Sequence, residues 1–326
     1  MKLFAYANTQ PLNAPFAISR GRKTHIETVR VHLHDEDTGC VGRGEGVPYP
    51  RYGETTGSVL AQIEGLKSDI ETCPDIQALQ SLMPAGAARC AVDCAFWDLQ
   101  AKLKRAPVWA LAGLPAPSPL HTAQTISLDR PQIMARAAHH TQGQWLKLKL
   151  GTPDDLACLD AVHKARPDAR LILDGNEGLK SEDFKAFCEA AKARGTVLIE
   201  QPFAEGADQA LAEMSLPLPI CADESAHICA DIAKLTSRYQ GVNIKLDKTG
   251  GLTEAIAMVK AAHAANMQIM IGCMVASSLS MAPAFLLAGQ ADFVDLDGPL
   301  WLKEDVPFGL VYDQGIIAPP QSDLWG

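Results

Sequence analysis

Three short apolar runs in the middle of the chain each end abruptly in a carboxylate. The runs 171–173, 197–199 and 219–222 are followed by Asp174, Glu200 and Asp223. These acids stand 26 and 23 residues apart, which matches one strand plus one helix of a (β/α)8 barrel. Because the carboxyl ends of the strands share one face of such a barrel, we expect the three side chains to converge there. Oxygen donors suit hard cations, so the pattern predicts a Mg²⁺ site.

The same alternation of strand-like and helix-like segments extends to both sides of these acids. Strands are predicted near 121–127, 145–150, 170–174, 197–201, 219–223, 241–246, 268–273 and 292–296. Helical periodicity separates them, for example over 154–166, 181–194 and 253–265. This order is typical of α/β proteins, and eight strands favour a closed (β/α)8-type barrel, a modified TIM barrel, over 116–300. No GxGxxG or Walker motif follows a strand, so nothing in the sequence supports nucleotide binding.

Residues 1–115 depart from this rhythm. Residues 28–33 alternate as a strand does, and 35–39 form a turn signal before Val41, which predicts an antiparallel meander. Helical spacing follows over 56–66 and 87–104, and prolines at 107, 115, 117 and 119 mark a boundary. We expect an α+β capping domain over 1–115, joined by a short C-terminal return over 301–326 that packs back on it.

The segment 16–23 of the first region is basic and carries Arg20, Arg22 and Lys23. In a purely structural interpretation it is the solvated tip of a hairpin. In a functional interpretation it is a mobile loop that offers a cation to an anionic substrate. The sequence alone leaves the two interpretations even.

The composition narrows the classes of partner. The chain has 326 residues, of which 47% are hydrophobic and 21% charged, and its formal net charge is −9. Such an acidic protein is unsuited to nucleic acid or an anionic membrane surface. No apolar stretch is long enough to span a bilayer, and no signal-peptide pattern opens the chain. Nine cysteines, several inside apolar runs and none in paired CxxC spacing, indicate reduced thiols in a cytoplasmic protein.

Lysines on two predicted barrel strands point to proton transfer. Lys147 and Lys149 alternate along the second strand, so both face the barrel interior, where lysine is rare without a partner. The structural alternative is one lysine that reaches solvent and one in an ion pair. In the functional interpretation, Lys147 and a nearby metal lower the pKa of Lys149 towards that of a general base. Lys245 ends the sixth strand and would face Lys149 across the metal.

This arrangement predicts a type of reaction. One lysine removes a proton from a carbon beside a carboxylate, and the opposite lysine returns a proton to the other face. The metal binds that carboxylate and stabilises the enolate that forms between the two steps.

Six motifs, in order over residues 147–299, resemble the muconate-lactonizing branch of the enolase superfamily. They are Lys147-Leu-Lys149, Asp174-Gly-Asn176, Glu200-Gln-Pro202, Ala222-Asp-Glu-Ser225, the run from Asn243 to Gly251, and Val294-Asp-Leu-Asp-Gly-Pro299. The last of these, the region from Gly44-Glu45 to Arg51-Tyr52-Gly53, and Pro84-Ala-Gly-Ala-Ala-Arg89 look like the dipeptide epimerases that act on L-Ala-D/L-Glu. A lysine base with Mg²⁺ is the documented pattern of the superfamily. The resemblance implies a Mg²⁺-dependent epimerase that inverts the C-terminal residue of a dipeptide during turnover of murein peptides.

The resemblance also implies roles for individual residues. One Mg²⁺ per subunit would be bound by Asp174, Glu200 and Asp223. The two acid/base groups would be Lys149 and Lys245, and Lys147 would touch the substrate carboxylate.

The implied substrate contacts come from four parts of the chain. Asp295 and Asp297 match an acidic pair that holds the α-ammonium group of the dipeptide, as a cationic amine requires. Thr125 and Met274 fall at pocket-lining positions. The cation that engages the glutamate side chain would be Arg20, Arg22 or Lys23.

Alternatives stay open at this point. An N-succinylamino-acid racemase or a muconate-type cycloisomerase would use the same metal and lysines, although a free amine suits Asp295 and Asp297 better than an acylated one. A non-catalytic small-molecule-binding protein would need a degenerate site, and the lysines and carboxylates are all present. Ala276 stands where many relatives have Glu, which leaves the recognition of the substrate open. Assembly as a homo-oligomer is also open.

Overall fold

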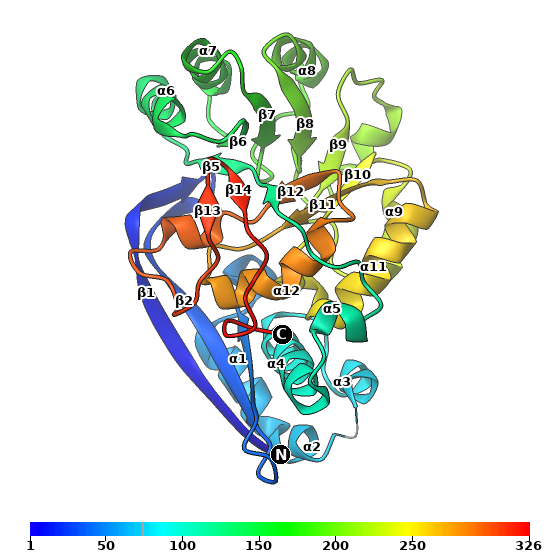
Figure 1. Ribbon diagram of the computed structural model, residues 1–326. Helices are drawn as coiled ribbons and strands as arrows, with labels where there is room; N and C mark the ends of the chain where they lie inside the picture. The colour runs from blue at the N-terminus through cyan, green and yellow to red at the C-terminus, as the bar shows by residue number, and fades with distance from the viewer. Residues whose placement is uncertain (74) are drawn as a thin grey trace.

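The computed structural model describes residues 1–73 and 75–326 and combines a barrel with a cap (Figure 1). The barrel sheet has eight strands in the order β12-β11-β10-β9-β8-β7-β6-β5, all paired in parallel. They span Gln124–Ile126 (β5), Trp145–Lys149 (β6), Arg170–Asp174 (β7), Thr196–Glu200 (β8), Ile220–Ala222 (β9), Gly241–Ile244 (β10), Gln268–Gly272 (β11) and Phe293–Asp295 (β12). A hydrogen bond of 2.7 Å from Ala123 N to Val294 O joins the two ends of the sheet. The predicted barrel is therefore confirmed.

Helices surround the barrel strands, but not in a regular succession. They span Pro131–His140 (α6), Asp155–Ala165 (α7), Phe184–Lys192 (α8), Ile232–Leu235 (α9), Leu246–Thr249 (α10), Leu252–Ala264 (α11) and Ser278–Ala288 (α12). After β8 the chain forms only a short 3-10 turn, Gln209–Glu213 (η2), in place of a full helix. Every residue of α12 is buried, because this apolar helix lies between β11 and the cap strand β3, Val41–Gly46.

The cap is an antiparallel sheet covered by helices. Its sheet consists of β1 (Lys2–Ile18), β2 (Gly21–His34) and β3, in that order. The helices are α1 (Thr56–Gly65), α2 (Lys67–Glu71), α3 (Ile76–Leu82), α4 (Ala87–Lys104) and α5 (Val108–Leu111). α4 packs along β3, and Phe96 and Leu99 of this helix share a core with Val29, Val31 and Leu33 of β2. The predicted antiparallel meander is confirmed, and its third strand, β3, includes Gly44 and Glu45.

The C-terminal return is more divided than predicted. Its strands β13 (Tyr312–Asp313) and β14 (Ile316–Ile317) pair with β4 (Leu120–His121), at the entry to the barrel, and not with the cap. The last residues do reach the cap, since Trp325 Nε1 donates to Cys94 O at 3.1 Å and Gly326 N to Asp98 Oδ1 at 2.9 Å. The domain boundaries at 115 and 300 stay predictions.

Two further features bear on the expectations from composition. All nine cysteines are free thiols in the structure. Among the described residues, no helix has both the length and the apolar character needed to cross a membrane.

Candidate active site

The three predicted carboxylates stand at the carboxyl ends of adjacent barrel strands. Asp174 and Glu200 are the last residues of β7 and β8 and pair with each other in register, while Asp223 directly follows β9. All three side chains are buried, with at most 2% of each residue exposed. Burial of three acids at one strand edge is costly unless cations accompany them.

Lys147 is the cation at the centre of this acidic cluster. Its Nζ lies 2.7 Å from Glu200 Oε2, 3.1 Å from Asp174 Oδ2 and 2.8 Å from Asp295 Oδ2. Burial alone would lower the pKa of Lys147, but the three carboxylates outweigh it and raise that pKa. We expected the charge of this lysine to act on Lys149. In the structure that charge is balanced by three acids instead.

The two predicted acid/base lysines lie on opposite sides of the cluster. Lys149 ends β6, and its Nζ is 2.6 Å from Asp174 Oδ2. Lys245 follows β10, and its Nζ is 2.6 Å from Asp223 Oδ2 and 4.0 Å from Glu200 Oε1. Burial opposes the charge of Lys245, but these two acids outweigh it and raise its pKa. Both amines face one cavity, so a substrate bound there would lie between them.

The acids themselves divide into two kinds. Burial, followed by the charge of Asp174, raises the pKa of Glu200 to about 7. Burial would also raise the pKa values of Asp174 and Asp223, but neighbouring lysines outweigh it and hold both below the usual range. The cluster therefore keeps two firmly ionised carboxylates beside one that titrates near neutrality.

The donor chemistry of the cluster fits a hard cation. As the side chains lie, no three His, Cys, Asp or Glu side chains in the described part of the chain are arranged to hold an ion, and the Lys147 amine bridges Asp174 and Glu200. The available donors are nevertheless oxygens on neighbouring strands, the set that Mg²⁺ prefers. Two more buried oxygens beside them, Asn176 Oδ1 and Glu224 Oε2, have no hydrogen-bond partner among the described residues.

A second acidic group lies at the end of β12. Asp295 Oδ1 is buried and has no partner in the described part of the chain. Asp297 Oδ2 accepts from Thr125 N at 2.6 Å and from Trp301 Nε1 at 3.4 Å. Burial, followed by the charge of Asp295, raises the pKa of Asp297 to about 6. A cation bound beside this pair would relieve both the burial and the repulsion.

One cavity of about 540 Å³ brings most of the predicted residues together. Its walls include Arg20, Arg22, Lys23, Thr125, Lys149, Asp223, Lys245, Met274, Asp295 and Asp297. Lys147, Asp174 and Glu200 are buried in contact with these residues but do not form part of the wall. The volume falls in the range of small-molecule sites.

The tip of the β1–β2 hairpin covers this cavity through Arg20. Its Nη1 donates to Asn176 O at 2.7 Å and lies 3.0 Å from Glu177 Oε2. Its Nη2 donates to Glu224 Oε1 at 2.7 Å and to Tyr49 OH at 3.0 Å. Arg20 therefore holds the hairpin tip against the loops that follow β7 and β9. The basic segment is a hairpin tip, as one interpretation predicted, and it also faces the cavity.

The other two cations of the tip are differently placed. Arg22 and Lys23 line the cavity, and neither has a carboxylate within ion-pair distance among the described residues. Burial lowers the pKa of Lys23, and its Nζ lies 5.6 Å from the centroid of the Tyr49 ring. These two cations remain available to an anion in the cavity.

Sequence reasoning did not identify Lys248 as part of the site. This lysine is 2% exposed, and its Nζ lies 2.6 Å from Asp223 Oδ1 and 3.0 Å from Asn243 O. The only available signal was its position three residues after Lys245. Tyr49 and Tyr52 also line the cavity, and sequence reasoning did not identify either of them as a site residue.

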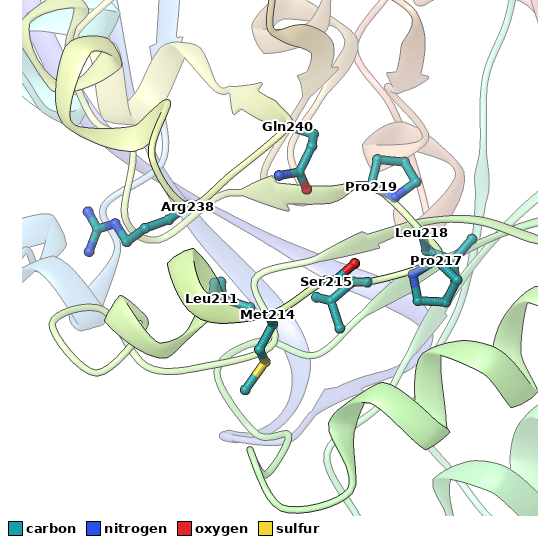
Figure 2. A pocket seen from close by; sticks show the side chains of 9 residues that line it. Leu211, Met214, Ser215, Pro217, Leu218, Pro219, Arg238 and Gln240 are labelled. Atoms are coloured by element: carbon teal, nitrogen blue, oxygen red, sulfur yellow. The ribbon is translucent and has the colours of Figure 1, made fainter.

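A second cavity, of about 400 Å³, lies at the other end of the barrel (Figure 2). Pro219 and Gln240, which line it, directly precede β9 and β10. Its cation, Arg238, is paired with Asp208 at 2.6 Å. Because barrel enzymes work at the carboxyl ends of their strands, this cavity is not the site of chemistry.

Comparison with known families agrees with this architecture. Residues 132–323 match the family described as enolase C-terminal domain-like. Residues 1–113 match the N-terminal domain of the mandelate racemase and muconate lactonizing enzymes. The chain therefore belongs to the enolase superfamily, in the branch of the mandelate racemase and muconate lactonizing enzymes.

Its relatives are epimerases and racemases. The L-Ala-D/L-Glu epimerase of Escherichia coli (strain K12) is 42% identical over 94% of this chain and 95% of its own length. The N-acetyl-D-glutamate racemase of a Pseudoalteromonas species is 44% identical over 87% of this chain and 91% of its own length.

Solved structures give the same picture. An enolase family member from Agrobacterium tumefaciens, with homology to dipeptide epimerases and with bound sodium and L-Ala-L-Glu, has a TM-score of 0.96 at 45% identity and covers 99% of both chains. The dipeptide epimerase of Enterococcus faecalis, in complex with Mg and L-Leu-L-Tyr, has a TM-score of 0.91 at 26% identity and covers 98% of this chain and 97% of its own.

Proposed function

We propose that this protein is a Mg²⁺-dependent dipeptide epimerase that inverts the glutamyl residue of L-Ala-D/L-Glu. The observation that carries the proposal is the placement of Lys149 and Lys245 on opposite sides of a buried acidic cluster, in one cavity that also presents Asp295 and Asp297. Inversion at carbon needs a base on one face and an acid on the other, which this placement supplies.

Each group of the cluster has a role in the proposal. Asp174, Glu200 and Asp223 hold Mg²⁺, and Lys147 keeps their combined charge in balance beside the substrate carboxylate. The chemistry that a bound Mg²⁺ supplies is stabilisation of the negative charge that develops on the carboxylate oxygens when the α-proton leaves.

Proton transfer falls to the two opposed lysines. One of them, neutral, takes the α-proton from its side, and the other, protonated, delivers a proton from its own. Epimerisation in the opposite direction exchanges the two roles. The hairpin tip, held by Arg20, excludes water while the carbon is negatively charged.

The two ends of the substrate are recognised by groups of opposite charge. Asp295 and Asp297 bind the α-ammonium group of the alanyl residue, with Thr125 and Met274 on the cavity wall nearby. Arg22 and Lys23 bind the glutamate side chain, because Arg20 is already paired with Glu177 and Glu224.

A racemase acting on N-acetylglutamate is the second candidate, favoured by the relative from Pseudoalteromonas. An acetylated amine carries no charge, so Asp297 and the Oδ1 atom of Asp295 would be left without a cationic partner, while Asp295 Oδ2 keeps its ion pair with Lys147. We infer that the dipeptide is preferred for this reason.

Parallel assays of inversion, with L-Ala-L-Glu and N-acetyl-L-glutamate as substrates and Mg²⁺ present, test the proposal. The expected result is a kcat/KM for the dipeptide at least about a hundredfold higher, since an unpaired buried acid costs about 3 kcal/mol. Preference for the acetylated amino acid would overturn it. In the cell, we propose, the enzyme acts in the cytoplasm on dipeptides released from murein.

A further inference from the structure

The long cap helix α4 presents one face to the chain that follows Lys245. Arg89, Asp93 and Trp97 are spaced four residues apart, so they share a face of the helix. All three donate to or accept from the segment 249–253, which runs from the last residue of α10 into the first turn of α11. The segments in contact are about half the chain apart in sequence, and none of these residues lines the cavity of about 540 Å³.

The buried guanidinium of Arg89 donates hydrogen bonds to backbone carbonyls. Its Nη2 donates to Thr249 O at 2.7 Å and its Nε to Gly250 O at 3.2 Å. Its Nη1 donates to Met83 O at 3.1 Å and to Gln80 O at 3.3 Å. Arg89 is only 6% exposed, and no carboxylate lies within ion-pair distance of it in the described part of the chain. A buried cation is costly without hydrogen bonds, so these four carbonyl contacts are what stabilises Arg89 in its buried position.

The approach of α4 to this segment requires glycine at two positions. Gly250 has a φ of 77° and Gly251 a φ of 112°, both in the region that favours glycine. A Cβ atom on Gly250 would lie 2.9 Å from Ala85 Cα, and one on Gly251 would overlap Asp93. Asp93 Oδ2 then accepts from Thr253 N at 3.2 Å, and Trp97 Nε1 donates to Thr253 Oγ1 at 3.0 Å.

The segment that α4 holds is continuous with Lys245. This lysine precedes the single turn of α10, and its carbonyl accepts from Lys248 N and Thr249 N, both at 3.0 Å. Gly250 N closes the turn on Leu246 O at 2.8 Å. Lys245 therefore lies one hydrogen-bonded turn away from the carbonyls that Arg89 holds.

The two opposed lysines differ in what fixes them. Lys149 is the last residue of β6 and is paired in the sheet with Asp174 of β7. Lys245 lies past the end of β10, which stops at Ile244. The sheet holds Lys149 directly, whereas the orientation of the Lys245 side chain depends on the turn that follows this residue.

We propose that Arg89 is a positioning residue for Lys245: through Thr249 and Gly250 the cap helix α4 sets the direction of this one lysine, and not of Lys149. The inference rests on the proposed function, because it concerns one of its two acid/base groups. It assigns the cap a part in the proton transfer itself, in addition to covering the cavity.

The test compares proton exchange from the two faces of the substrate separately. L-Ala-L-Glu and L-Ala-D-Glu are each incubated with enzyme and Mg²⁺ in D₂O, and the initial loss of the glutamyl α-proton is followed by NMR. Lys149→Ala and Lys245→Ala show which epimer each lysine serves. Arg89→Met is expected to slow proton exchange from the epimer that Lys245 deprotonates at least about tenfold. The exchange rate of the other epimer should stay within about twofold of the wild-type rate.

The control variants come from the same helix and the same contact. Lys102→Met removes a cation of α4 that contacts Val41 O and Asp98, within the cap, and should alter neither rate. Arg89→Lys, which keeps one donor, should restore part of the lost rate. If Arg89→Met fails to fold, Thr253→Val serves as a milder variant, because it removes only the hydroxyl that accepts from Trp97. It should slow proton exchange from the same epimer.

Three outcomes decide the matter. In Arg89→Met, a slower exchange of only the epimer that Lys245 deprotonates, with an unchanged melting temperature, supports the inference. Equal loss for both epimers, or none, overturns it and leaves the epimerase proposal in place. Absence of exchange from either epimer with the wild-type enzyme overturns the epimerase proposal, and the inference with it.

Discussion

Removal of the Lys147 amine should reveal the charge balance of the acidic cluster. The variant Lys147→Met keeps the length and apolar stem of the side chain and deletes only its positive charge. In the wild type, that charge lies within 3.1 Å of Asp174, Glu200 and Asp295, and Lys147 is 1% exposed. The variant leaves these acids to repel one another in a medium of low dielectric constant.

The expected cost follows from the number and burial of the partners. Breaking a buried ion pair by removing one member costs about 3–5 kcal/mol. For a chain of 326 residues, such a loss of unfolding free energy lowers the melting temperature by about 4–7 °C. The matched control is Lys67→Met, whose Nζ lies 3.9 Å from Glu64 Oε2 at an exposed site, so its effect should stay below about 1 kcal/mol.

The loss should depend on pH in a defined direction. The pKa of Glu200 is about 7 in the wild type, and removal of Lys147 should raise it further. A carboxyl with a raised pKa in the folded state stabilises that state below its unfolded pKa and loses this contribution as the pH rises through the folded pKa. The variant should therefore be most destabilised near pH 8 and less so near pH 5.5.

Calorimetric melting in the presence of a chelator, at both pH values, measures these differences directly. Added Mg²⁺ should then narrow the gap between variant and wild type, because a cation among the acids replaces part of the missing charge. A loss below about 1 kcal/mol near pH 8, or a loss that is the same at both pH values, would refute the idea that Lys147 is the counter-ion of the cluster.

Two more predictions concern the ends of the substrate. Since the pKa of Asp297 is about 6, kcat/KM for L-Ala-L-Glu should fall below that pH, by up to about tenfold per pH unit. Asp297→Asn should lower kcat/KM at neutral pH and make it less dependent on pH, and a pH dependence as steep as that of the wild type would contradict the role of this carboxyl. Arg22→Met and Lys23→Met should raise KM for L-Ala-L-Glu about tenfold and leave KM for L-Ala-L-Leu unchanged, whereas Arg20→Met should impair turnover of both dipeptides because it releases the hairpin tip. Steady-state kinetics with the two substrates tests this, and a loss specific to L-Ala-L-Glu in Arg20→Met alone would assign the glutamate side chain to Arg20 instead.

The barrel and its acidic centre were predictable from the sequence because both depend on local patterns. An apolar run that ends in a carboxylate marks a strand end wherever it occurs, and parallel pairing then brings Asp174, Glu200 and Asp223 to one edge. The alternation of Lys147 and Lys149 likewise determined that both side chains face inwards.

Contacts between distant segments were beyond such patterns. No pattern in the sequence indicates that Asp93 accepts a hydrogen bond from Thr253, 160 residues away. Lys248 was not identified as part of the site, because burial of its amine beside Asp223 depends on tertiary packing. The pairing of β14 with β4 was missed for a similar reason, since two-residue strands carry no periodicity.

The most direct test of the central claim is proton exchange at the glutamyl α-carbon. Wild type, Lys149→Ala and Lys245→Ala are incubated with L-Ala-L-Glu and Mg²⁺ in D₂O and followed by NMR. Two-base epimerisation predicts that the wild type forms L-Ala-D-Glu with deuterium at this carbon, and that both variants lose epimerisation while one of them still exchanges the proton. Formation of L-Ala-D-Glu by either variant at the wild-type rate would contradict the account.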